Sequence, residues 1–184
     1  GNISVRHNNG FLITPSGKKY SSLKVKDIVF VSLNGKYEKK YKPSSEWRFH
    51  QDIYIKKKDA QAIVHTHSTN ATALSVHKKP IPAFHYMVAL AGGNDIKCAK
   101  YATYGTRELS KNILKALNER KACLIANHGQ IAFDNNLPDA FELAQEVENL
   151  SLQYITALKL GKPKKLSLKE MNKVLKKAKN YKRD

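Results

Sequence analysis

The sequence predicts an α/β fold: a single domain over residues 1–184 with a mostly antiparallel central β-sheet layered by α-helices. The length of 184 residues, 41% of them hydrophobic, is enough to bury one core. Short apolar runs alternate along the chain with longer segments in which apolar residues recur at helical spacing. Neither an internal repeat nor a clear linker interrupts this order, so we expect one domain.

The first half of the chain combines strands with one well-marked helix. Asn34-Gly35 is typical of a hairpin turn, which predicts antiparallel pairing of the segments on either side of it. After Pro43 the apolar residues change to helical spacing, and Ser44 or Ser45 can cap the helix that begins there. The elements expected here are strands over residues 10–17, 27–33, 36–42 and 60–67, a helix from residue 44 and a short helix over residues 68–77.

The second half of the chain contains the longest expected helix. Pro138 suits the first turn of that helix, which runs to about Lys159. Thr106 can cap another helix, with Leu109 and Ile113 on one face. The elements expected here are an apolar helix over residues 83–93 closed by Gly92-Gly93, a short strand over 95–102, a helix over 106–120, two strands around a turn at 127–129, the long helix, and a last helix opened by Ser167 and Glu170.

The net charge of +18 comes mainly from lysine, spread from Lys18 to Lys182. A polyanion would explain this charge, but no zinc finger, basic zipper or aromatic RNA-binding pattern accompanies it. We therefore expect no nucleic-acid partner. No apolar run approaches the roughly 20 residues of a membrane span, so no membrane partner is expected either. Cys98 and Cys123 are isolated thiols, which fits a reducing cytoplasm.

His65 and His67 stand two residues apart at the end of an expected strand. Residues i and i+2 of a strand project from the same face, so both imidazoles could converge on a metal ion. Taken alone, this spacing is more typical of two polar residues at a strand end.

Three further polar clusters carry the same ambiguity. Taken one at a time, they could be a turn, a helix cap and a hydrogen-bonded turn histidine. Their joint occurrence favours a functional site. They are "GNIS" with "TPSG" at residues 14–17, the helix start at Ser44 and Ser45 followed by Glu46, and His128 beside Gly129.

The chain resembles the class II aldolase/adducin-type family, and most closely its L-fuculose-1-phosphate aldolase branch. The matching stretches follow one another in family order from Gly1 to about Tyr154, over four-fifths of the chain. They are "GNISVR", "FLITPSG", "KPSSEWRFH", "AIVHTHSTNATALS", "IPAFHYMVALAGGNDIKCAKYATYGTRELS", "ANHGQIAF" and "LAQEVENLSLQY".

The resemblance implies a catalytic zinc ion held by His65, His67 and His128. Three imidazoles leave an open coordination position for the substrate, and zinc there would stabilise an enediolate as a Lewis acid. Glu46 falls on the family's catalytic acid/base and could also ligate the ion before substrate arrives. No lysine is then needed for the chemistry.

The resemblance also implies a substrate site shared between subunits. A neutral cradle would bind the phosphate, formed by Asn2, Ser16, Gly17, Ser44 and Ser45. Tyr86 would act from a neighbouring subunit as proton donor to the aldehyde oxygen, although helical spacing alone would make it a core aromatic. Tyr104 and Tyr181 would line the aldehyde pocket, and the assembly would be a cyclic tetramer.

The implied reaction is reversible cleavage of a ketose 1-phosphate to dihydroxyacetone phosphate and L-lactaldehyde. Three alternatives of the same superfamily remain open. Pentulose-phosphate 4-epimerases carry Asp where this chain has Glu46, methylthioribulose-phosphate dehydratases share the three histidines, and adducin-like binding domains are expected to lack them. Because members of the family begin upstream of the "GNIS" match, we also expect a helical segment before Gly1.

Overall fold

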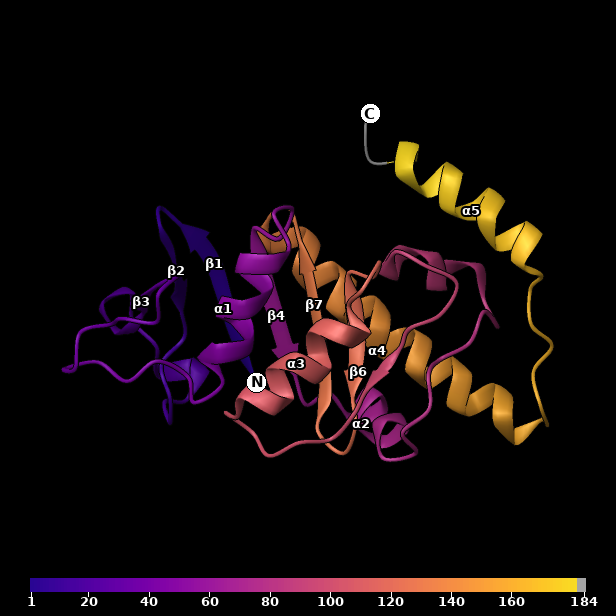
Figure 1. Ribbon diagram of the computed structural model, residues 1–184. Coiled ribbons are helices and arrows are strands. Elements are labelled where there is room, and N and C mark those ends of the chain that lie inside the picture. The colour runs from indigo at the N-terminus through magenta and orange to yellow at the C-terminus, as the bar shows by residue number, and fades with distance from the viewer. Residues whose placement is uncertain (182–184) are drawn as a thin grey trace.

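The computed structural model describes the backbone of residues 1–181 and the side chains of residues 1–178. Within this part of the chain, seven strands form one sheet in the order β3-β2-β1-β4-β7-β6-β5 (Figure 1). All neighbouring strands are antiparallel except β5 and β6. The α/β fold with a mostly antiparallel sheet is therefore confirmed. The strands are β1 Asn2–His7, β2 Gly10–Ile13, β3 Val29–Ser32, β4 Ala62–Thr66, β5 Cys98–Ala99, β6 Ala122–Ile125 and β7 Gly129–Asp134.

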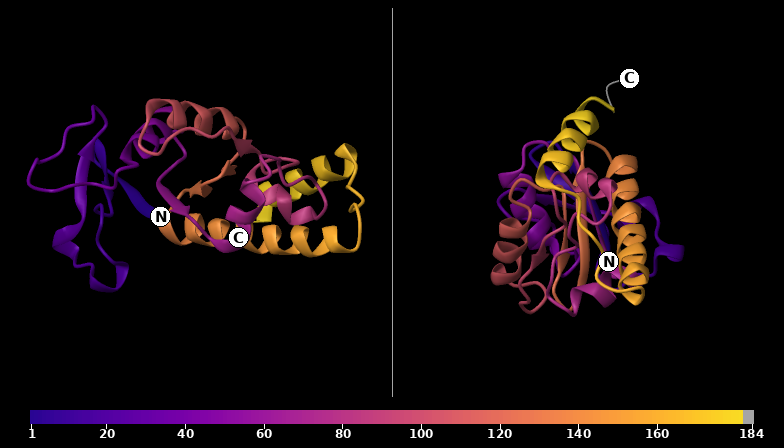
Figure 2. Two further views of the ribbon diagram at one scale, coloured as in Figure 1. Left: turned by 90° about the horizontal axis from the view of Figure 1, so that it is seen from below. Right: turned by 90° about the vertical axis from the view of Figure 1, so that its right-hand side faces the viewer.

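Helices cover both faces of the sheet, so the domain has three layers (Figure 2). Helices α1 and α3 pack together on one face, and α2 and α4 pack together on the other. The last helix, α5, packs against the 3-10 helix η3. The helices are α1 Trp47–Lys56, α2 Thr69–Ser75, α3 Arg107–Ala116, α4 Leu137–Lys159 and α5 Leu168–Tyr181, with 3-10 helices η1 Tyr20–Ser22, η2 Val25–Asp27 and η3 Tyr86–Ala91.

The sheet separates two buried apolar clusters. Side chains alternate along a strand, so Ile63 of β4 joins the cluster under α1 and α3, whereas Val64 joins the cluster under α2 and α4. His65 lies two residues after Ile63 and therefore shares the α1 side of the sheet. This alternation directs the first histidine of the H-x-H motif toward the start of α1.

Several cap predictions hold in the structure. The side chain of Thr106 accepts a hydrogen bond from the backbone of Leu109, and Pro138 lies in the first turn of α4. Ser167 accepts a hydrogen bond from the backbone N–H of Glu170 at the start of α5. The hydroxyl oxygens of Thr106 and Ser167 each satisfy an N–H group that the helix itself leaves unpaired.

Four local predictions were wrong. Neither Ser44 nor Ser45 caps α1, whose N-cap residue is Glu46 without a side-chain cap hydrogen bond. Residues 36–42 form no strand, although the turn at Gly35 does form, with φ at 81°. That segment ("KYEKKYK") is lysine-rich and has no apolar face to bury against the sheet. Residues 83–93 contain only the six-residue η3 instead of a full α-helix, ending where Gly92 adopts φ of 93°. The first residues of the chain, where no strand was predicted, form β1.

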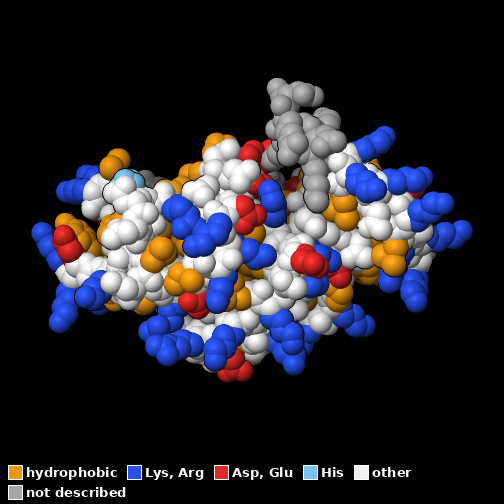
Figure 3. All heavy atoms as spheres, turned by 45° about the horizontal axis from the view of Figure 1, so that its top comes forward, with side chains coloured by type: hydrophobic (Ala, Val, Ile, Leu, Met, Phe, Trp, Pro, Cys, Tyr) orange, Lys and Arg blue, Asp and Glu red, His pale blue; other side chains and the backbone are white. Residues whose placement is uncertain are grey.

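The positive charge is distributed over the surface. Figure 3 shows Lys and Arg side chains along the whole length of the visible face, interspersed with hydrophobic and acidic side chains. None of the described helices combines the length and the apolar composition needed to cross a membrane.

Candidate metal centre and phosphate pocket

Two loops and one strand end bring the three histidines together. His65 is in β4, opposite Asn2 of β1 and Ile131 of β7, and His67 follows the end of β4. His128 lies in the turn between β6 and β7. The next residue, Gly129, is required there, because a Cβ atom would lie 2.3 Å from the carbonyl oxygen of Thr66. Glycine therefore allows the His128 turn to approach the strand that carries the other two ligands.

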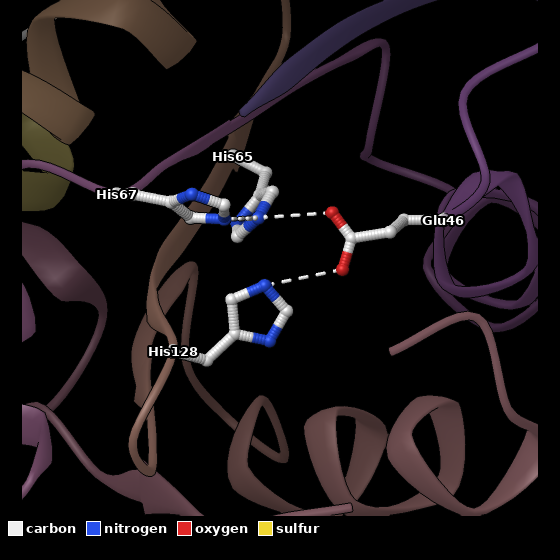
Figure 4. A group of neighbouring side chains, drawn as sticks. All are labelled: Glu46, His65, His67 and His128. Atoms are coloured by element: carbon white, nitrogen blue, oxygen red, sulfur yellow. Dashed lines mark hydrogen bonds and ion pairs between the residues drawn. The ribbon is translucent and has the colours of Figure 1, made fainter. Parts of the chain in front are cut away.

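The three imidazole rings form a compact cluster with Glu46 beside it (Figure 4). The ring centroids lie 4.8 Å apart for His65 and His67, and 4.9 Å apart for each of the other two pairs. Glu46 Oε2 lies 3.2 Å from His65 Nε2, and Glu46 Oε1 lies 3.1 Å from His128 Nε2. Glu46 is the residue immediately before α1, so the first turn of that helix fixes its backbone.

The hydrogen bonds of His65 fix its tautomer. Its Nδ1 lies 2.7 Å from the carbonyl oxygen of Gln130, which only accepts, so Nδ1 carries the proton in a neutral ring. The lone pair of Nε2 then points at His67 Nε2, 3.0 Å away, and at Glu46 Oε2. A hydrogen bond donated by His67 would account for the contact between the two imidazoles. In the contact with Glu46, however, neither His65 Nε2 nor the carboxylate oxygen carries a hydrogen. A cation between them would remove this repulsion.

The ionisation states of the cluster suit a metal ion. Burial raises the pKa of the Glu46 carboxyl, but the neighbouring rings of His128 and His65 outweigh burial and hold that pKa well below its ordinary value. Desolvation lowers the pKa of His65, and desolvation together with the nearby His65 lowers the pKa of His67 to about 4. A carboxylate and neutral imidazoles are the forms in which these side chains bind metals.

The spacing of the ligand atoms agrees with this chemistry. One ligand atom from each of Glu46, His65, His67 and His128 lies within 4.8 Å of the others. Ligands about 2.0–2.1 Å from a tetrahedral zinc ion lie about 3.3 Å apart, close to the separations within the cluster. In addition, Glu46 Oε1 is buried and accepts no hydrogen bond from the described residues. The residues present therefore fit a divalent cation.

A pocket of about 400 Å³ adjoins the cluster and shares Glu46 and His67 with it. Two loops form its wall, joined by hydrogen bonds from Ser16 N to Lys42 O and from Ser44 N to Thr14 O, both 3.0 Å. Gly17 adopts φ of 71°, a conformation that favours glycine. The pocket is lined by all five residues predicted to bind phosphate, namely Asn2, Ser16, Gly17, Ser44 and Ser45.

The pocket differs from the predicted neutral cradle in one respect. Lys18 and Lys19 also line it, so cationic side chains stand at its wall. Lys18 Nζ is paired with Asp27, 2.6 Å away, while η1 begins one residue after Lys19. Sequence reasoning missed both lysines because a lysine-rich chain gives no signal that singles them out.

The predicted tyrosines lie outside the pocket lining. Tyr86 is 53% exposed and Tyr104 is 66% exposed, so neither is a core aromatic of the described chain. The structure of this single chain leaves both side chains open to contact by another molecule. The side chain of Tyr181 lies outside the described residues.

Sequence reasoning also missed His50. This histidine lies at helical spacing with the apolar residues of α1, and it is completely buried and hydrogen-bonded to Asn2. A histidine on an apolar helix face was the available signal, because a buried polar ring needs partners.

Comparison with known proteins agrees with the fold. The family described as "Class II Aldolase and Adducin N-terminal domain" matches residues 1–155. The chain is 50% identical over 182 residues to L-fuculose phosphate aldolase of Escherichia coli (strain K12), covering 98% of this chain and 85% of that protein. It is 51% identical over 181 residues to 5-methylthioribulose-1-phosphate/5-deoxyribulose-1-phosphate aldolase of Rhodospirillum rubrum, covering 98% and 82%.

Among solved structures, one called L-fuculose 1-phosphate aldolase superposes with a TM-score of 0.93 at 42% identity. The match covers 97% of this chain and 85% of that one. The chain therefore belongs to the class II aldolase family. Both of the relatives named above are aldolases, and the similarity to each extends over 98% of this chain.

Proposed function

We propose that the chain is a zinc-dependent aldolase that reversibly cleaves a ketose 1-phosphate to dihydroxyacetone phosphate and a short aldehyde. The first candidate substrate is L-fuculose 1-phosphate, which would yield L-lactaldehyde. One observation supports this proposal most directly: Glu46 belongs both to the histidine cluster and to the lining of the adjoining pocket. If the phosphate occupies the pocket and the cluster holds the carbonyl group at C2, a carboxylate in that place can reach C3, the neighbour of the carbonyl carbon on the side away from the phosphate.

The protein side chains divide the work of the reaction. Held by His65, His67 and His128, zinc would supply Lewis-acid stabilisation of the charge on the substrate's carbonyl oxygen. In cleavage, the C3–C4 bond breaks with its electron pair on C3, and Glu46 returns a proton to C3. In synthesis, Glu46 removes that proton. Such acid–base work contributes about 10²–10⁴-fold in rate.

Phosphate recognition would combine neutral donors with a positive field. The N–H groups of Gly17 and Ser45 donate to no acceptor among the described residues, so both remain available to an anion. The serine hydroxyls of the pocket add further donors, and Lys18 and Lys19 would attract the phosphate to its entrance.

The proposal extends to the assembly. The C4 hydroxyl of the substrate loses its proton as the aldehyde forms, and Tyr86 of a neighbouring subunit would exchange this proton. The exposure of Tyr86 and Tyr104 supports such a contact, because exposed aromatic side chains are typical of interfaces. We propose a cyclic tetramer of single-domain subunits in the cytoplasm, in which Tyr104 and Tyr181 complete the aldehyde pocket.

A second candidate substrate class has its own support. The relative from Rhodospirillum rubrum is named for 5-methylthioribulose 1-phosphate and 5-deoxyribulose 1-phosphate, and it is as similar as the L-fuculose phosphate aldolase. All these ketose phosphates share the dihydroxyacetone phosphate half that the described pocket would bind. They differ in the aldehyde half. Dehydration, 4-epimerisation and adducin-like binding remain the alternative functions.

The test is release of dihydroxyacetone phosphate, followed with a coupled NADH assay. Zinc-loaded protein should cleave L-fuculose 1-phosphate or a 5-substituted ribulose 1-phosphate, and a chelator should abolish the activity. Glu46→Gln should lose at least about 10²-fold in kcat and still bind zinc. Chelator-insensitive cleavage would exclude the zinc-dependent mechanism, and loss of water without carbon–carbon cleavage would exclude the aldolase.

A further inference from the structure

His50 connects the candidate acid/base to the interior of the protein. It lies in α1, four residues after Glu46, and its ring nitrogens both have partners. Nε2 bonds to Asn2 Oδ1 and Nδ1 lies 2.7 Å from Ser4 Oγ, which in turn lies 2.8 Å from the hydroxyl of Tyr54. Asn2 Nδ2 donates to Glu46 Oε2 at 3.0 Å. A chain of hydrogen bonds thus runs from a core tyrosine to the Glu46 carboxylate.

With a neutral His50 ring, only one arrangement of protons satisfies this chain. The carboxylate only accepts, so the NH₂ group of Asn2 must face it and the amide oxygen must face His50. His50 must then carry its proton on Nε2, which leaves a lone pair on Nδ1. Ser4 donates to that lone pair and accepts from the Tyr54 hydroxyl. If the Asn2 amide were flipped, its oxygen would lie 3.0 Å from Glu46 Oε2, and two acceptors would repel each other.

The surroundings of His50 keep the ring neutral and fixed. It has no exposed surface, and the ring of Phe49 stacks on it with centroids 4.8 Å apart. Desolvation, followed by the electrostatic interaction with the nearby His65 ring, lowers the pKa of His50 to about 3. A neutral ring with its proton on one defined nitrogen donates in a single direction, which is what an orienting group requires.

We propose that His50 is a positioning residue for the aldolase reaction: it fixes the amide of Asn2, which then aims the Glu46 carboxylate. This inference rests on the proposed function. Asn2 is the hydrogen-bond donor to Glu46 Oε2 among the described residues. Without the bond from His50, the amide of Asn2 could rotate and present its oxygen to Glu46. The carboxylate would then lose its donor and its fixed orientation.

Two variants of His50 separate positioning from packing. In His50→Gln the side-chain NH₂ group can take the place of Nε2 and still donate to Asn2. In His50→Asn the shorter amide reaches only the place of Nδ1 near Ser4, so the bond to Asn2 is lost. Both variants leave a smaller side chain than histidine in the core, so both lower stability.

The measurements are kcat and KM for the cleaved ketose phosphate, zinc content, and the visible absorption of the cobalt-substituted protein. His50→Asn should lower kcat about 10- to 100-fold with a smaller change in KM, because misplacing a catalytic group by about 1 Å costs rate more than binding. It should also shift the cobalt spectrum, because Glu46 lies beside the ion. His50→Gln should recover most of kcat and the wild-type spectrum.

Equal kcat losses in both variants, or none in either, would overturn the proposal and leave His50 as a packing residue. If neither variant folds, ¹⁵N NMR of the wild-type protein provides the decision. His50 must show the neutral Nε2–H tautomer between pH 5 and 9, and a charged ring or an Nδ1–H tautomer would overturn the proposal. If the wild type cleaves no ketose phosphate, the proposed function fails, whereas the cobalt and NMR measurements still test the orientation of Glu46.

Discussion

Removal of divalent metal should lower the thermal stability of the protein by a predictable amount. The cluster of Glu46, His65, His67 and His128 exists in the folded chain because β1, β4, the β6–β7 turn and α1 meet there. An unfolded chain has no such site, so metal binding stabilises the folded state selectively. At a free zinc concentration of about 100 times Kd, this linkage contributes about 2.7 kcal/mol.

The corresponding shift in Tm follows from the size of the domain. For chains of about 150–250 residues, 1 kcal/mol shifts Tm by about 2–4 °C. Zinc added to chelator-treated protein should therefore raise Tm by about 5–11 °C, measured by differential scanning calorimetry.

His67→Ala is the matched control for this experiment. The side chain of His67 is exposed, so its removal should change the stability of the metal-free protein little. The variant should nevertheless lose most of the zinc-dependent shift. An equal zinc shift in wild type and variant, or a shift that magnesium reproduces, would refute the assignment of this cluster as a metal centre.

Three further predictions concern residues that support the site. Arg6 donates to three backbone carbonyls at and beyond the end of α1, so Arg6→Met should lower the free energy of unfolding by about 2–4 kcal/mol in urea titrations, and Arg6→Lys should recover little of it. In Gly129→Ala the new methyl group meets the carbonyl of Thr66, which should cost about 1–3 kcal/mol of stability and weaken zinc binding in a chelator competition; unchanged affinity would contradict the role given to this glycine. Burial raises the pKa of Glu148, but hydrogen bonds from the backbone of Ala71 and Asn70 outweigh it and lower that pKa below 4.5. The carboxylate therefore stabilises the fold above that pH and less as pH falls through the lowered value, so Glu148→Gln should flatten the acid limb of the stability–pH profile.

The sequence was most informative where local chemistry determines structure. Thr106 and Ser167 mark helix starts because each accepts a hydrogen bond from an N–H group three residues on, and Pro138 marks one because its ring fixes a helical φ and it lacks an N–H. It misled in residues 36–42, where the Asn34-Gly35 turn forms without a second strand. A turn can be specified by two residues, but a strand needs a neighbour to pair with and an apolar face to bury.

By itself, the sequence determined which side chains could bind a cation and a phosphate, since the identities of three histidines, a glutamate and a group of small polar residues are set along the chain. Only the tertiary structure decided which of these side chains lie next to one another. Asn2 is 44 residues from Glu46 and 48 from His50, and the hydrogen bonds that join the three depend on pairing of β1 with β4 and on packing of α1 against the sheet. Lysines at the pocket wall and the tautomer of a buried ring likewise depend on which groups become neighbours, because hydrogen bonds and charges act over a few ångströms of space and not along the chain.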